Sequence, residues 1–168
     1  MMRTLSALAL VLVLNGCAGN PTPYQPKADR TGYSEQQLDA QTWRVQFAGN
    51  INTPRETVEN YLLYRSAEIM LFGGYDKFVM FEKNIENNVR YRATGLYPHF
   101  GYSSHHGYHH GLGFYAPVNY SPSVSYSGTA TIRIYSGGSP PNNAPIYDAQ
   151  EIVQLLGPTI VLPQTGSG

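Results

Sequence analysis

Residues 53–74 have the sequence TPRETVENYLLYRSAEIMLFGG, which predicts the long helix on which the fold is built. Thr53 has the position of an N-cap residue, whose side-chain oxygen accepts a hydrogen bond from a backbone N–H group of the first turn. A proline follows at the first helical position, and the Glu56 carboxylate can accept a hydrogen bond from the backbone N–H of the cap residue. Arg65 and Glu68 are three residues apart and are expected to pair on the helix surface. Two glycines end the helix, because glycine readily adopts left-handed backbone. The apolar side consists of Val58, Leu62, Ile69 and Phe72.

Strand patterns lie on both sides of this helix. Residues 42–48 alternate, with Trp43, Val45 and Phe47 on one face, which predicts a half-buried strand. Trp43 is therefore assigned to the core rather than to a glycan-binding platform. After the helix, residues 78–81 form a short continuous apolar run between charged residues, which predicts a strand covered on both faces.

The second half of the chain adds further elements. Residues 84–88 contain turn-forming side chains, so residues 89–94 are expected to return as a hairpin partner. Residues 124–135 alternate again and predict a longer strand. Asp148 is placed to cap a short helix over residues 149–156, which a Gly-Pro pair ends.

Together these elements predict an α+β fold, in which a small, mostly antiparallel sheet has one long and one short helix packed on one face. The strand at 42–48, the long helix and the strand at 78–81 have the order of a right-handed parallel crossover. A single domain is assigned to residues 32–162, with a Gly/Tyr/His-rich insertion at 97–122. Residues 163–168 are expected to form a flexible tail.

The N-terminus has the pattern of a bacterial lipoprotein signal. Arg3 is followed by an apolar run over residues 5–14, which is too short to span a bilayer as a helix. The sequence Leu-Asn-Gly-Cys at 14–17 then resembles a lipobox, with a small residue before Cys17. Residues 1–16 are therefore expected to be a signal peptide and Cys17 to be the lipidated residue, through a thioether diacylglycerol and an acylated amine. The alternative is an ordinary secretory signal with an incidental cysteine.

Lipidation at Cys17 would anchor the protein to a membrane, since two or three acyl chains hold far more firmly than one. Ala18 follows the cysteine in place of the aspartate of an inner-membrane retention signal, which favours the periplasmic face of the outer membrane. Residues 17–31 contain three prolines and no apolar periodicity. They are expected to form a lipidated, Pro-rich tether with a reach of about 40 Å.

Several segments resemble an uncharacterised family of proteobacterial lipoproteins. The matching residues are GYSE at 32–35, WRVxFxGN at 43–50, Thr53 and YLLYRSAE at 61–68. The likeness extends over roughly residues 24–95 and excludes the His-rich segment. It implies lipidation and a related fold, and it brings no established activity and no catalytic residue.

Composition narrows the classes of function. The chain has 11 Lys and Arg against 11 Asp and Glu, so it lacks the basic surplus of a nucleic-acid-binding protein. With its single cysteine lipidated, no thiol is left for a disulfide, a thiolate metal site or a cysteine nucleophile.

All five histidines lie within residues 99–110. Clustered imidazoles bind Zn²⁺, Cu²⁺ or Ni²⁺, and His105 with His109, like His106 with His110, has i,i+4 spacing. Glycines interrupt the segment, and no acidic residue is near to orient the rings, so any metal site here would be open and weak. The alternative is a solvated, low-complexity loop.

Sequence motifs for catalysis are weak. Residues 111–116 match a dinucleotide-binding pattern but follow no strand, and Pro117 blocks the helix that this pattern requires. Residues 101–105 fail the last position of GxSxG. We therefore expect no catalytic residue, no resident cofactor and a non-enzymatic, lipid-anchored envelope protein with a structural or binding role. Its expected partner is an envelope protein or peptidoglycan. Metal binding by the His-rich segment is the alternative function, and an envelope hydrolase is a third.

Overall fold

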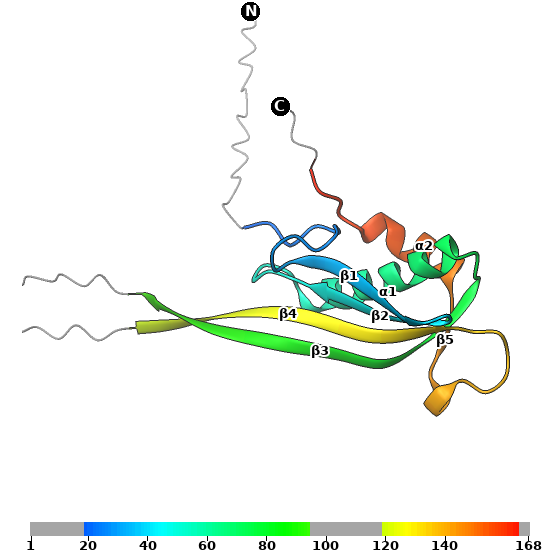
Figure 1. Ribbon diagram of the computed structural model, residues 1–168. Coiled ribbons are helices and arrows are strands. Elements are labelled where there is room, and N and C mark those ends of the chain that lie inside the picture. The colour runs from blue at the N-terminus through cyan, green and yellow to red at the C-terminus, as the bar shows by residue number, and fades with distance from the viewer. Residues whose placement is uncertain (1–18, 95–118, 165–168) are drawn as a thin grey trace, which may run out of the picture.

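The structure, a computed structural model, describes residues 19–94 and 119–164 as an α+β fold (Figure 1). Five strands form one sheet in the order β1-β2-β4-β3-β5, and all neighbours are antiparallel. The long helix α1 covers one face of the sheet, and the short helix α2 packs against α1. The expected α+β class is confirmed. The elements are β1 (Gly32–Asp39), β2 (Thr42–Ala48), α1 (Arg55–Phe72), β3 (Lys77–Thr94), β4 (Asn119–Ile134), β5 (Ile146–Asp148) and α2 (Ala149–Leu156), with short 3-10 turns at Pro141–Asn143 and Gly157–Thr159.

The strand order explains the role of the long helix. β2 and β3 are each antiparallel to β4, so they run in the same direction with β4 between them. α1 therefore connects two parallel strands that are not neighbours. The expected β-α-β connection is present, with a strand from later in the chain inserted in it.

β3 is much longer than the sequence pattern predicts. It pairs with β4 from Phe78 to Thr94, so the hairpin turn expected at 84–88 is wrong. Asn84, Glu86 and Asn88 alternate with Ile85 and Val89, which places these three polar side chains on the solvent-facing side of a strand rather than in a turn.

β4 is also longer than expected at its start. Its inward positions Ala130 and Ile132 are fully buried, as the alternation predicts. Residues 119–122, assigned to the insertion at 97–122, belong to this strand. The rest of that insertion up to residue 118 and the tail from residue 165 lie outside the described residues.

The core lies between α1 and the sheet. Its main cluster consists of Val45, Leu62, Ala67, Met70, Phe78, Met80, Ala130, Ile132 and Ala149. Each large apolar side chain buried here contributes roughly 1.5–3 kcal/mol, so this layer holds the helix on the sheet.

Trp43 packs against the edge of the cluster and is only partly buried. The apolar run at 78–81 belongs to β3 and pairs with β4 on one side and with β5 on the other. Val79 points away from the main cluster and is nevertheless buried, so at this residue the strand is covered on both faces, as expected.

The two helices begin differently. The Asp148 carboxylate accepts a hydrogen bond from the backbone N–H of Glu151 at 3.1 Å, which confirms the cap expected for α2. For α1 the expected cap is wrong: Pro54 occupies the N-cap position, and the Thr53 side chain makes no cap bond. Thr53 is engaged elsewhere, as described below. Phe72, expected on the apolar side, is 81% exposed at the end of the helix.

Candidate functional site

The segment that follows Cys17 in the sequence is part of the folded domain. Thr22 and Tyr24 are only 2% and 6% exposed, so the tether expected over residues 17–31 is wrong from Thr22 onward. The Tyr24 N–H donates to the carbonyl of Val161 at 2.7 Å, near the C-terminal end of the described chain. Further along, the N–H of Tyr33 donates to the carbonyl of Gln25 at 2.8 Å. The segment thus lies across the domain between β1 and the residues after α2.

Thr53 fixes the start of this segment. Its hydroxyl oxygen accepts hydrogen bonds from the backbone N–H groups of Thr22 at 2.9 Å and Asn50 at 3.2 Å. It also donates to the side-chain oxygen of Asn50 at 2.8 Å. In return, the Asn50 N–H donates to the Thr22 hydroxyl at 2.8 Å. The residue that looks like a helix cap therefore joins the N-terminal segment to the β2–α1 turn.

Tyr24 enters a cluster of aromatic rings beside α1. Its ring centroid lies 4.7 Å from that of Tyr33, 5.4 Å from that of Tyr61 and 5.2 Å from that of Tyr64. The contacts with the two helix tyrosines are edge-to-face, an arrangement that aromatic rings favour. Tyr61 continues the cluster to Phe47 on β2, at 5.0 Å. Tyr24 is thus the apolar anchor of the segment.

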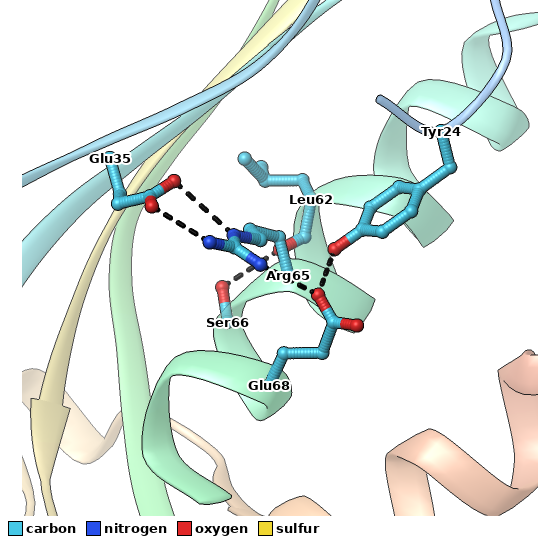
Figure 2. Close-up of polar contacts among 6 residues, drawn as sticks. All are labelled: Tyr24, Glu35, Leu62, Arg65, Ser66 and Glu68. Carbon is cyan, nitrogen blue, oxygen red and sulfur yellow. Dashed lines mark hydrogen bonds and ion pairs between the residues drawn. The ribbon is translucent and has the colours of Figure 1, made fainter. Parts of the chain in front are cut away.

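A polar network surrounds the Tyr24 hydroxyl (Figure 2). The hydroxyl donates to the carboxylate of Glu68, which also accepts from Arg65 at 2.9 Å. Arg65 forms two further bonds to Glu35 on β1, at 2.7 and 3.2 Å, and lies over the ring of Tyr33. The expected Arg65–Glu68 pair is confirmed, whereas the contribution of Glu35 comes from the tertiary fold. The network joins the N-terminal segment, β1 and α1.

The protonation states of this network are fixed. Burial and then the hydrogen bond to Glu68 raise the pKa of Tyr24 well above its ordinary value. For Arg65, burial acts to lower the pKa, but hydrogen bonds to Glu35 and Glu68 outweigh it and raise the pKa. The phenol stays neutral and the guanidinium stays charged at physiological pH. The network is therefore suited to holding the segment in place, and not to proton transfer.

A hollow of about 580 Å³ adjoins the same segment. β3 and β4 continue past the end of β2 as a two-stranded ribbon, residues 87–94 and 119–126 (Figure 1). The hollow lies where this ribbon leaves the sheet, and residues 27–32 form its other wall. Ser34, Gln46 and Thr129 occupy one row across β1, β2 and β4 at its floor. Because the neighbours of Gln46, Val45 and Phe47, are buried toward α1, this row faces the opposite way.

The hollow is lined by hydroxyl groups and cations. Serines at every second position of β4 (Ser123, Ser125 and Ser127) line it together with Thr129. Lys27, Arg30 and Arg90 add three positive charges, against the single carboxylate of Asp29. Within the described part of the chain none of the three cations forms an ion pair. Such a lining is suited to a ligand that carries both hydroxyl and anionic groups, because cations bind anions with charge-assisted hydrogen bonds.

Sequence reasoning missed both the docked segment and the hollow. The alternation of serine and threonine from residue 121 to residue 131 was the available signal for the hollow. The cations opposite this row come from residues far away in the sequence, which no local pattern connects to β4.

The site residues expected from the sequence are not among those that the structure describes. Cys17 and the histidines His105, His106, His109 and His110 lie outside the described residues. In residues 19–94 and 119–164, no three His, Cys, Asp or Glu side chains gather as a metal site. The same residues contain no helix of the length and apolarity needed to cross a bilayer. No family model, curated protein or solved structure matches this chain.

Proposed function

We propose that this chain is a lipid-anchored protein of the cell envelope, held at the membrane through acylated Cys17 and facing the periplasm. The lipobox-like sequence at 14–17 supports the anchor, and Ala18 supports the outer membrane as its place. Its role is to bind an envelope component at the membrane surface, without catalysis. The observation that carries this proposal is the docking of Thr22 and Tyr24 immediately after the lipidated position.

The docked segment determines how far the domain stands from the lipid. Thr22 is the fifth residue after Cys17, and an extended chain spans at most about 3.3–3.6 Å per residue. Thr22 is therefore held within about 18 Å of the acylated residue, less than half the reach expected of a free tether. The lining of the hollow begins at Lys27 in the same segment, so a short connection to the lipid would keep the hollow near the membrane surface.

The lining of the hollow favours peptidoglycan over a protein partner. Peptidoglycan presents sugar hydroxyls together with carboxylates, and the hollow offers hydroxyls, amides and three cations without an ion-pair partner among the described residues. The lining includes no His or Cys and a single carboxylate, so the chemistry it offers is hydrogen bonding and charge attraction. A protein partner is the other outcome that the tests below distinguish.

The anchor is tested by labelled fatty acid and membrane fractionation. The wild-type protein should incorporate the label and sediment with outer membranes. Cys17→Ser should incorporate none and should accumulate as precursor or appear in the soluble fraction. Wild-type protein that carries no label would refute the lipid anchor.

The ligand is tested by co-sedimentation of the detergent-solubilised, full-length protein with purified peptidoglycan sacculi. The double variant Lys27→Gln/Arg30→Gln removes two of the three cations of the hollow and should sediment several-fold less. Arg44→Gln is the matched control, because Arg44 is an exposed cation of β2 outside the hollow. Equal sedimentation of all three proteins, or no sedimentation of the wild type, would contradict peptidoglycan binding by the hollow. Crosslinking to one envelope protein, lost only in the double variant, would instead favour a protein partner.

A further inference from the structure

The ribbon has two outer edges that the rest of the described chain leaves open. β5 pairs with β3 only at Lys77, Phe78 and Val79, and β2 pairs with β4 no further than Ser127. Beyond these points β3 and β4 pair only with each other, and the ribbon projects from the body of the domain (Figure 1). Open strand edges present rows of unpaired backbone groups that can pair with another chain.

The two edges are not equivalent. The carbonyl of Tyr126 accepts a bond from Gly49 on the β2 side, so even-numbered residues of β4 direct their backbone groups away from β3. Pro122 is one of them, and it has no N–H to offer, which blocks the β4 edge. β3 contains no proline from Lys77 to Thr94. Tyr91 is opposite Pro122, so the odd-numbered residues of β3 direct their N–H and C=O groups outward on an edge able to pair.

The side chains of the ribbon divide into an apolar and a charged face. Val89, Tyr91, Tyr120 and Val124 are 45%, 70%, 63% and 37% exposed, on the face that Ile85 continues from the core. The other face of β3 has Glu86, Asn88 and Arg90 at every second position. Within the described residues no cation pairs with Glu86 and no carboxylate pairs with Arg90.

We propose that the free edge of β3 pairs with β3 of a second copy of this chain, antiparallel around a two-fold axis at Asn88. In this register Glu86 of each copy is opposite Arg90 of the other, and the charge order of the strand is complementary to itself. Asn87 is opposite Val89, and both direct their backbone outward, so each such pair exchanges two hydrogen bonds. Ile85 is opposite Tyr91 on the apolar face. The interface is isologous, as in most dimers.

Self-complementarity is what selects a second copy as the occupant. In a two-fold antiparallel pair, a residue that precedes the axis by a given number of positions is opposite the residue of the other copy that follows the axis by the same number. Glu86 precedes Asn88 by two positions and Arg90 follows it by two, so the acid of each copy is opposite the base of the other. The Glu86–Arg90 pairs fall at positions without backbone bonds, where the opposed Cα atoms approach to about 4.5 Å and side chains are closest. The apolar faces of the two ribbons then join into one surface.

The first test uses the axis itself. Asn88 would be opposite its own copy at a Cα distance that a disulfide spans. Full-length Asn88→Cys in membranes should therefore form a disulfide-linked dimer under mild oxidation. Arg92→Cys is the matched control, since it lies on the same exposed face four residues from the axis and its copy would be roughly 26 Å away along the strands. Cross-linking of Asn88→Cys should be at least about tenfold faster than that of Arg92→Cys, and equal rates would overturn the proposal.

The second test uses charge reversal on the Asn88→Cys background. Glu86→Arg places like charges opposite each other and should slow cross-linking several-fold. Adding Arg90→Glu exchanges the two charges and should restore the rate. Failure of the double variant to recover, while its trypsin resistance equals that of the wild type, would overturn the β3–β3 register. Asn88 and Arg90 also line the hollow. Peptidoglycan binding is therefore judged separately, with the Lys27→Gln/Arg30→Gln variant, which leaves the β3 edge unchanged.

Discussion

Replacing Tyr24 measures how firmly the segment after Cys17 is bound to the domain. The side chain is 6% exposed and contacts the rings of Tyr33, Tyr61 and Tyr64. Truncating a buried aromatic side chain to alanine costs about 3–5 kcal/mol. We expect Tyr24→Ala to lower the free energy of unfolding by this amount, a large share of the roughly 5–15 kcal/mol that stabilises a typical domain.

Tyr24→Phe separates the ring from the hydroxyl. It keeps the aromatic contacts and removes the hydrogen bond to Glu68, which still has Arg65 as a partner. Hydrogen bonds to charged groups contribute about 1.5–3 kcal/mol, and the remaining ion pair reduces the loss. The expected cost is about 1–2 kcal/mol, clearly less than that of alanine.

The assay is urea unfolding of the mature protein in mild detergent, followed by the fluorescence of Trp43. Trp43 is the single tryptophan and packs at the edge of the main core, away from Tyr24, so its signal reports unfolding of the domain. Tyr33→Phe is a suitable control, because the hydroxyl of Tyr33 makes no hydrogen bond to any described residue. An alanine variant within about 0.5 kcal/mol of the wild type, the range of neutral surface substitutions, would refute the docking of this segment.

Three further predictions follow from the same contacts and from the sequence. Because the pKa of Tyr24 is raised in the folded protein, the hydroxyl contributes fully to stability below pH 10.0, its ordinary pKa, and progressively less as pH rises above that value. The difference in free energy of unfolding between wild type and Tyr24→Phe should therefore narrow in urea titrations at alkaline pH. A difference that stays constant with pH would contradict this. Thr53→Ala leaves the buried Thr22 N–H without its acceptor and should cost about 1–3 kcal/mol, whereas Thr53→Ser should stay close to wild type. Calorimetry should detect weak binding of Cu²⁺, and this binding should be lost as pH falls below about 6.5 and the imidazoles become protonated. Changing the four histidines of 105–110 to asparagine should abolish it. A large rise in melting temperature on adding metal would instead indicate a preformed site.

Local patterns predicted the elements whose signals are local. The alternation at 42–48 gave β2 because one face of that strand is buried, and Asp148 capped α2 because its partner is only three residues away. The polar residues at 84–88 misled, since the side chains that form turns also occupy the solvent face of a strand. Composition alone does not distinguish a turn from the solvent face of a strand when the partner strand lies far away in the sequence.

The candidate site depended on long-range contacts that no local pattern contains. Thr53 matches a capping sequence, yet its hydroxyl binds Thr22, 31 residues earlier. Three prolines made residues 17–31 resemble a tether, and nothing in that composition reveals that Tyr24 fits among tyrosines of β1 and α1. The serine row of β4 was visible in the sequence, but its meaning depended on cations that the docked segment brings beside it.

Hydrogen exchange at the backbone of the N-terminal segment tests the central claim most directly. The N–H groups of Thr22 and Tyr24 donate to Thr53 and Val161, so both should exchange as slowly as the amides of β1. Tyr24→Ala should release this protection, so that the amides at positions 22 and 24 exchange faster than those of β2, which stay protected until the whole domain unfolds. Exchange of Thr22 and Tyr24 in the wild type at the rate of an unstructured peptide would show a free tether. It would contradict the docking of this segment, on which the proposed short distance to the membrane depends.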